Sequence, residues 1–304
     1  MTATPDTVNA APIDYTCRYC RLSSVLGSER ACPCCGAPVH LQDAVSRSGW
    51  IEQPPVPDMT RIQFGRSHVQ IAGDQVAVAE FALHPDQSIY FPHHALLWTE
   101  PSVRLGNHPN AGGWKRLLAG MPSYMVDASG PGRIGVSDNH AGEVIAIPLP
   151  AGTGMWVREH RFLAATGNID YTFTSSNLWY ATGSGDERET HYPLGWYDDV
   201  FVARGEPGLL LLHAPGNTFI RDLAPGEVIH VQPRSLIYKD FSVGMYLHVE
   251  APRTTGWSTW RRSYQLRTMF LRLTGPGRVA VNSIFENELE GEPLTGGSYT
   301  YHQW

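Results

Sequence analysis

The chain of 304 residues is 42% hydrophobic and 17% charged, with a formal net charge of −6 at pH 7. This composition excludes a disordered polypeptide, and the acidic balance argues against general binding to nucleic acids or anionic membranes. No apolar run approaches the roughly 18–20 residues that cross a bilayer, and the first seven residues have neither the basic nor the apolar region of a signal peptide. We therefore expect a globular, cytoplasmic protein without a membrane span.

All five cysteines lie between residues 17 and 35. Cys17 and Cys20 form one C-x-x-C pair, and Cys32 and Cys35 form a second pair after eleven intervening residues. A C-x-x-C turn places two sulfurs on one side of an ion, and two such turns supply the four soft ligands of tetrahedral zinc. The spacing therefore predicts a zinc ribbon whose metal ligands are Cys17, Cys20, Cys32 and Cys35.

The expected zinc is structural, because four cysteines close the coordination shell. Gly36 permits a tight turn whose amides can point at the thiolates, and so short a segment would take its folding energy from the metal. Cys34 is spare and could replace Cys32 or Cys35 as a ligand. A thioredoxin-like redox motif would need a βαβ context, which the surrounding sequence does not offer.

After the ribbon, one pattern occurs three times. Each copy has a leucine, a turn and a short apolar strand, then an apolar pair, and later a glycine-rich turn before another apolar strand. Such repeats indicate a β-fold built by duplication. The copies are Leu83–Phe91, Leu96-Leu97 and Ser129–Val136; Leu149–Val157, Phe162-Leu163 and Gly205–Leu212; and Leu223–Val231, Leu236-Ile237 and Thr274–Val281.

Turn residues separate the predicted strands. In each glycine-rich turn, proline presets φ at the first corner and glycine takes the positive φ of the second, which assigns one role to Gly132, Gly208 and Gly277. Gly152 and Gly226 serve the turn after the repeat leucine, where the first copy has Asp86. We predict strands at 75–83, 142–149, 243–249 and 279–284, short helical segments at 113–120 and 261–270, and an exposed loop at 183–191.

The expected organisation has five parts, because the composition changes at each boundary. They are a disordered tail at 1–14, the zinc ribbon at 15–45, a linker at 46–58 that contains three prolines, a three-unit β-body at 59–290, and a C-terminal tail at 291–304.

The motifs of the body resemble those of the altered-inheritance-of-mitochondria protein twenty-four family. The resemblance covers roughly residues 65 to 285 and is carried by the segments 205–216, 221–231 and 272–283. It implies an all-β fold of tandem, TRAP-like units, each a shortened double-stranded β-helix, arranged with pseudo-symmetry. The resemblance transfers no catalytic residue.

An enzyme would most plausibly be a cupin-like metal enzyme, since cupins share the double-stranded β-helix. His93, His94 and Glu100 are candidates, but adjacent histidines on a strand point to opposite faces. His94 and His160 hold equivalent positions, where the third copy has Arg234, so a symmetric three-histidine site fails. Metal in the body would direct attention to His94, His160 and His230. Gly130–Gly135 matches a dinucleotide-binding pattern, but a strand rather than a helix is expected to follow it.

A nucleic-acid-binding regulator is the second alternative. Trp257, Trp260, Arg261 and Arg262 could stack bases and hold phosphate, although core or oligomer contacts suit an acidic chain better. We predict a non-enzymatic scaffold or binding protein that self-associates, for example as a trimer, since repeated short strands leave edges that can pair. Its structural zinc ribbon would contact a protein partner.

Overall fold

The computed structural model describes residues 13–17, 20, 22–26, 31–39, 51–52, 61–73, 75–108, 125–182, 188–250 and 268–284. Within these ranges the chain is almost entirely β-strand, with short 3-10 turns η2 (His93–Ala95) and η4 (Pro233–Ser235), so the all-β prediction is confirmed. Contacts divide the chain into two units, Met1–Glu52 and Gln53–Trp304, at a boundary inside the predicted linker. The described residues contain no helix with the length and apolar character needed to span a membrane.

The N-terminal unit is small. Its strands β1 (Ile13–Thr16) and β2 (Ser23–Leu26) form an antiparallel pair in which Thr16 faces Ser23. A two-residue strand, β3 (Ile51–Glu52), lies at its end. The predicted tail at 1–14 was therefore too long, because Ile13 and Asp14 belong to β1; residues 1–12 lie outside the described ranges.

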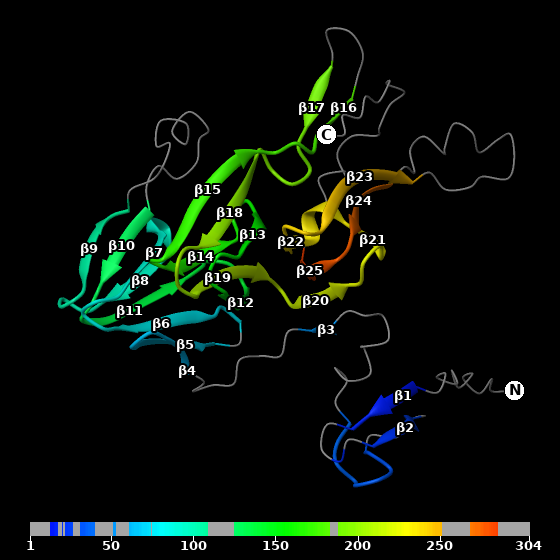
Figure 1. The fold of residues 1–304 in the computed structure, drawn as a ribbon, viewed down its shortest axis with the longest axis horizontal. Helices are drawn as coiled ribbons and strands as arrows, with labels where there is room; N and C mark the ends of the chain where they lie inside the picture. Colours follow the sequence, from blue (N-terminus) through cyan, green and yellow to red (C-terminus); the bar gives the residue numbers. More distant parts are fainter. Residues whose placement is uncertain are drawn as a thin grey trace, which may run out of the picture. The chain divides into compact units, whose positions relative to one another are not determined.

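The C-terminal unit, called the body below, contains the three repeats, each with six strands (Figure 1). The hairpin β4 (Arg61–Phe64) and β5 (Ser67–Ala72) precedes them, and the hairpin β16 (Tyr180–Thr182) and β17 (Glu189–His191) interrupts the second. Unit A has β6 (Val78–Leu83), β7 (Ser88–Pro92), β8 (Leu96–Thr99), β9 (Arg104–Asn107), β10 (Met125–Ser129) and β11 (Gly132–Ser137). Unit B has β12 (Gly142–Leu149), β13 (Gly154–Arg158), β14 (Phe162–Thr166), β15 (Ile169–Ser175), β18 (Tyr197–Ala203) and β19 (Gly208–Pro215). Unit C has β20 (Thr218–Leu223), β21 (Val228–Val231), β22 (Leu236–Asp240), β23 (Gly244–Glu250), β24 (Thr268–Thr274) and β25 (Gly277–Asn282).

The three units share one strand-pairing scheme. In each unit the sixth strand pairs with the first and third, and the fifth pairs with the second and fourth, all antiparallel. Each unit therefore has two three-stranded layers, which is the arrangement expected of a shortened double-stranded β-helix. A bulge falls at the same place in all three third strands, at the second residue of the repeated apolar pair.

Neighbouring units join edge to edge. Strand β14 of unit B pairs with β7 of unit A, which gives the sheet order β12-β19-β14-β7-β10-β9. Strand β22 of unit C pairs with β13 of unit B, which gives the order β15-β18-β13-β22-β25-β20. The outer layers are β4-β5-β6-β11-β8 in unit A and β21-β24-β23 in unit C. In Figure 1 the cyan strands of unit A and the yellow-to-orange strands of unit C lie on opposite sides of unit B.

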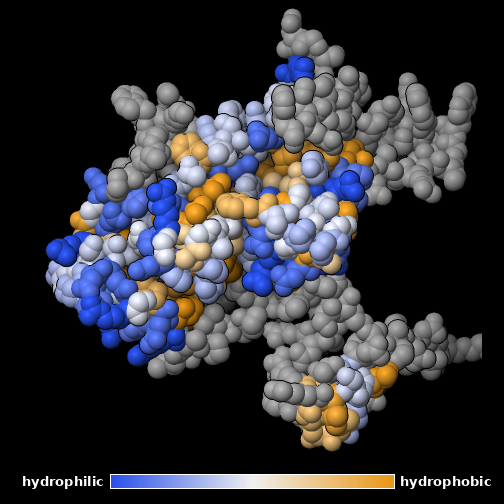
Figure 2. Space-filling model, viewed as in Figure 1, coloured by the Kyte–Doolittle hydropathy of each residue, from blue (hydrophilic) through white to orange (hydrophobic). Residues whose placement is uncertain are grey.

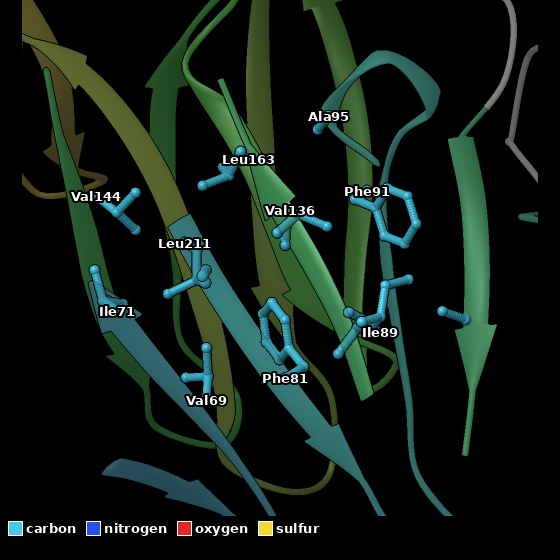
Figure 3. Packing of buried hydrophobic residues seen from close by; sticks show 14 of the residues in the cluster. Val69, Ile71, Phe81, Ile89, Phe91, Ala95, Val136, Val144, Leu163 and Leu211 are labelled. Carbon is cyan, nitrogen blue, oxygen red and sulfur yellow. The ribbon is translucent and has the colours of Figure 1, made fainter. Parts of the chain in front are cut away.

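Strand β19 explains how one chain forms two adjoining cores. Its leucine run is apolar on both faces, and successive side chains of a strand point to opposite faces. Leu209 and Leu211 therefore pack in a core with residues of unit A, including Phe81, as Figure 3 shows for Leu211. Leu210 and Leu212 pack in the second core, which extends to Tyr238 of unit C. A strand buried on both faces is expected to read as a continuous apolar run.

The glycine-rich turns follow the prediction in units A and C only. Gly132 and Gly277 have φ of 137° and 134° and follow cis prolines Pro131 and Pro276. Gly208 was assigned the same role, but it has no positive φ; Gly205, with φ 68°, takes that conformation in unit B. One shared motif therefore covers two different backbone turns.

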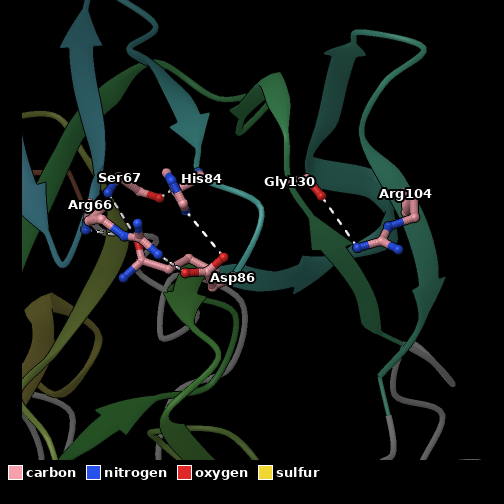
Figure 4. Close-up of polar contacts among 7 residues, drawn as sticks. Arg66, Ser67, His84, Asp86, Arg104 and Gly130 are labelled. Atoms are coloured by element: carbon pink, nitrogen blue, oxygen red, sulfur yellow. Dashed lines mark hydrogen bonds and ion pairs between the residues drawn. The ribbon is translucent and has the colours of Figure 1, made fainter.

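The turn after the repeat leucine also has a variant in unit A. Gly152 and Gly226 both have φ 77°, as predicted, whereas Asp86 does not adopt a positive φ. The same turn hydrogen bond nevertheless forms in unit A, from the Gln87 amide to the His84 carbonyl at 3.0 Å. Asp86 instead pairs with Arg66, as drawn in Figure 4, and its Oδ1 atom lies 3.4 Å from His84 Nδ1. Asp86 thus connects this turn to the turn between β4 and β5.

Two further predictions are corrected by the body. The segment 261–270 was expected to be helical, but Thr268–Phe270 begin β24, where long-range pairing with β23 overrides local helix propensity. The loop expected at 183–191 ends in β17, which pairs with β16. The predicted helix at 113–120 and the tail at 291–304 lie outside the described residues.

Candidate metal centre

The first cysteine pair lies in the loop that closes the β1–β2 hairpin. Cys17 directly follows β1, and its amide donates a hydrogen bond to the Leu22 carbonyl at 3.1 Å. Cys17 is buried and Cys20 is half-buried. Because Thr16 and Ser23 face each other across the hairpin, both sulfurs lie at the same end of it.

The second pair lies in a compact turn between the bridged residues Ala31 and Pro38. The Cys32 amide donates to the Ala37 carbonyl at 2.7 Å, and the Gly36 amide donates to the Cys32 carbonyl at 2.8 Å. Gly36 has φ 73°, a conformation that side chains disfavour, so the glycine is needed for this turn, as predicted.

The four predicted ligand atoms converge. The sulfurs of Cys17, Cys20, Cys32 and Cys35 all lie within 4.8 Å of one another. Cys17 Sγ is 3.7 Å from Cys35 Sγ, and Cys20 Sγ is 3.9 Å from Cys32 Sγ. A tetrahedral zinc with Zn–S bonds of about 2.3 Å has S–S edges of about 3.8 Å. The spacing therefore fits tetrahedral metal binding, and Cys34 is exposed and outside the group.

Electrostatics at the cluster favour a cation. A backbone hydrogen bond from Cys34 lowers the pKa of the Cys32 thiol, although burial opposes this. A backbone hydrogen bond at Ala37 lowers the pKa of Cys35, but burial and the neighbouring sulfurs outweigh it and raise that pKa to about 12. Four adjacent thiols therefore resist losing all their protons together, and a divalent cation would remove this repulsion.

The body brings a second set of titratable side chains together, around Asp138, which sequence reasoning did not single out. Asp138 Oδ1 lies 2.7 Å from His140 Nδ1, and Asp138 Oδ2 lies 3.6 Å from His213 Nδ1. His213 is buried, and burial lowers its pKa while Asp138 opposes the shift. The pKa of His94 is also lowered, by partial desolvation of its ring and then by the neighbouring His93, although the residue as a whole is exposed. Nothing in the repeat pattern marks Asp138 or His213, since their proximity arises from the join between β12, β19 and the turn before β12.

The histidines considered for a cupin-like metal site lie in different local structures from one another. His93 and His94 lie in η2 rather than on a strand, so their predicted opposite orientation does not apply; both are exposed, with ring centroids 5.6 Å apart. His160 is exposed in a turn with φ 63°. His230 stacks on His248 with centroids 4.2 Å apart. Among the described residues, the four-cysteine group is the set whose possible metal ligands converge.

Glu100, the third cupin-like candidate, accepts a backbone hydrogen bond that has an equivalent in units B and C. Its Oε2 accepts a hydrogen bond from the Arg133 amide at 2.9 Å. Thr166 Oγ1 and Asp240 Oδ2 hold the equivalent positions and accept from the amides of Leu209 at 3.0 Å and Arg278 at 2.8 Å. The shared role is to satisfy the amide at the start of each sixth strand.

The residues proposed for nucleic-acid binding cannot be placed. Trp257, Trp260, Arg261 and Arg262 lie outside the described residues. That alternative therefore stays a prediction from the sequence.

Comparisons with known proteins concern the body. The family model described as "Mitochondrial biogenesis AIM24" matches residues 69–284, which lie in the body and exclude the ribbon. The search of curated proteins gives no significant match. Among solved structures, protein SPYM3_0169 from Streptococcus pyogenes is similar, with a TM-score of 0.53 and 15% sequence identity over 72% of this chain and 94% of that chain. At this identity the likeness shows the fold alone.

Proposed function

Because the chain belongs to the AIM24 family, whose model matches residues 69–284, we propose that it is a non-enzymatic scaffold or binding protein that acts as a homo-oligomer in the cytoplasm. Its N-terminal ribbon would hold one structural zinc and contact a protein partner. The convergence of four cysteine sulfurs carries the zinc part of this proposal, because four thiolates close the coordination shell and leave no position for a substrate.

The surface of the ribbon supports a role in partner contact. Leu22 and Val25 expose 55% and 62% of their surface on a unit with a very small core. Figure 2 shows hydrophobic side chains gathered on the visible face of this unit. An apolar patch on so small a unit would be suited to binding a protein partner.

Metal content per chain, measured by elemental mass spectrometry, tests the metal assignment. We expect one zinc per wild-type chain, none in a Cys17→Ser/Cys32→Ser double variant, and one in the matched Cys34→Ser control, since Cys34 lies outside the group. Metal that persists in the double variant would overturn the proposal, because it would place a site in the body and favour the cupin-like enzyme.

Partner contact needs a separate test. Photo-crosslinking from position 25 in producing cells should capture one reproducible protein, and Leu22→Asp should abolish capture while the zinc stays bound. Capture that does not change in Leu22→Asp would argue against the apolar surface as the contact.

A further inference from the structure

The joins between units A and B and between units B and C use the same strand register. At the first join Ala165 faces Tyr90 and Thr166 faces Ile89. At the second join Lys239 faces Trp156 and Asp240 faces Met155. These residues hold equivalent positions in the repeats, so the third strand of one unit meets the second strand of the preceding unit in the same way both times. The body thus contains two copies of one interface.

Each end of the row of units has an unused half of that interface. Among the described residues, β8 of unit A has β11 as its strand neighbour, and β21 of unit C has β24. β8 is the third strand of its unit and β21 is the second strand, so they correspond to the two partners of each internal join. Both are therefore open edges within the described body.

Side-chain exposure on β8 shows which surface of unit A lacks the cover that a preceding unit gives in units B and C. Leu97, Leu163 and Ile237 are equivalent residues of the repeated apolar pair, and they expose 58%, 1% and 0% of their surface. Trp98 is 37% exposed, whereas its equivalents Ala164 and Tyr238 are buried. The same local pattern is therefore covered in units B and C, which have a preceding unit, and uncovered in unit A.

Strand β21 shows the complementary half. Val228 exposes 39% of its surface and His230 is exposed. Tyr90 and Trp156, the equivalents of His230 in units A and B, are buried beneath the following unit. Exposed apolar strand edges are sites where a further strand can pair.

We propose that the occupant of these edges is a second copy of this chain, with β21 of one copy paired to β8 of the next. The internal register places Thr99 of that next copy opposite His230 of the first copy, and Trp98 of the next copy opposite Val231 of the first. The pairing would extend the outer layers into one continuous sheet in the order β4-β5-β6-β11-β8-β21-β24-β23. Because the two halves differ, assembly is head to tail and forms a ring or an open chain.

A second copy is favoured because both halves are present on one chain and match an interface that the chain already uses twice. This inference deepens the proposed self-association by naming its surface. It does not depend on the ribbon or its zinc.

Charge insertion tests the interface. We expect the wild-type chain to form assemblies larger than one chain at micromolar concentration by mass photometry, and Leu97→Lys or Val228→Lys each to shift the distribution to monomer. Leu105→Lys is the matched control, because Leu105 is an exposed leucine on β9, a sheet edge equivalent to β15 and β23. It should assemble like wild type.

Paired cysteines test the register in a Cys34→Ser background. Residues paired across antiparallel strands have Cα atoms about 4.5–5.5 Å apart, which suits a disulfide. Oxidised Thr99→Cys/His230→Cys chains should give a ladder of linked copies on a non-reducing gel. Trp98→Cys/His230→Cys chains should not, because a shift of one residue points the side chains to opposite faces.

The outcomes separate the two proposals. Assemblies that persist in Leu97→Lys and Val228→Lys would show that β8 and β21 are not the interface, but they would leave self-association in place. A monomeric wild type would overturn both, and a disulfide within one chain would show that β8 and β21 close on each other. None of these results changes the zinc measurement.

Discussion

The ribbon and the body maintain their folds by different physical means. In the described part of the ribbon, the buried cluster consists of Tyr15, Cys17 and Cys32, with Cys20, Ala37 and Val39 against it. The body has two extensive apolar cores that share strand β19. Of the three buried residues described in the ribbon, two are candidate metal ligands, whereas the body buries aliphatic and aromatic side chains from units A, B and C.

This difference shows how chain length selects a stabilising strategy. A segment of about forty residues buries too little apolar surface to offset the entropy of ordering, so we expect a metal bound by the four cysteines to supply the balance. The body is long enough for hydrophobic burial to suffice. We therefore expect four perturbations to affect the ribbon and the body unequally. In decreasing order of effect, they are metal removal, core truncation, loss of a polar contact and acidification.

Chelation should produce the largest effect, confined to the ribbon. Zinc binding contributes roughly 10–16 kcal/mol in small zinc-dependent peptides, so stripping the metal should unfold the ribbon completely. Amide hydrogen exchange followed by mass spectrometry should then show lost protection in β1 and β2 and unchanged protection in β19. Protected β1 and β2 amides after metal loss would contradict the comparison.

A core truncation should act on the body. Leu211 is buried in the core shared by units A and B, and Leu211→Ala should lower the free energy of unfolding by about 2–5 kcal/mol because it leaves a cavity. Thermal unfolding monitored by circular dichroism measures the change. The exposed Leu105→Ala should cost far less, and zinc content should stay the same in both variants.

Loss of one repeated polar contact should cost less. Thr166→Val removes the hydroxyl that accepts the Leu209 amide and leaves that buried donor unsatisfied, at a cost of about 1–3 kcal/mol. Thr99→Val is the control, since its hydroxyl contacts only the exposed carbonyl of Glu100 in the described residues. Equal unfolding temperatures for the two variants would show that the amide finds another partner.

Acidification should give the smallest effect. Burial lowers the pKa of His213, and the charge of Asp138 partly opposes this shift. The charge of Arg161 lowers the pKa further, while His140 raises it through a backbone hydrogen bond and lowers it through its charge. The unfolded chain therefore binds more protons than the folded chain below the ordinary histidine pKa of about 6.5. The free energy of unfolding of the body should have its full value above that pH and should decline below it. His213→Gln should reduce the decline measured by chemical unfolding, and exposed His160→Asn should leave it unchanged.

Much of the candidate site could be predicted, because it is local in sequence. The C-x-x-C spacing identified the four cysteines that converge and the glycine that takes a positive φ. The Asp138 cluster could not be predicted, since Asp138 and His213 are separated by a whole repeat and meet only through strand pairing. The turn at Gly208 was assigned wrongly because one short motif can adopt two backbone geometries.

The sequence by itself determined the repeat units, the strands within the repeated motifs and the apolar pairs, because side-chain alternation and turn residues act over a few neighbouring positions. Only the tertiary structure decided which of the equivalent pairs is covered. Leu97, Leu163 and Ile237 have similar local sequences, yet Leu97 is exposed and the other two are buried. The reason is that burial depends on the neighbouring unit, and unit A has no unit before it within the described body.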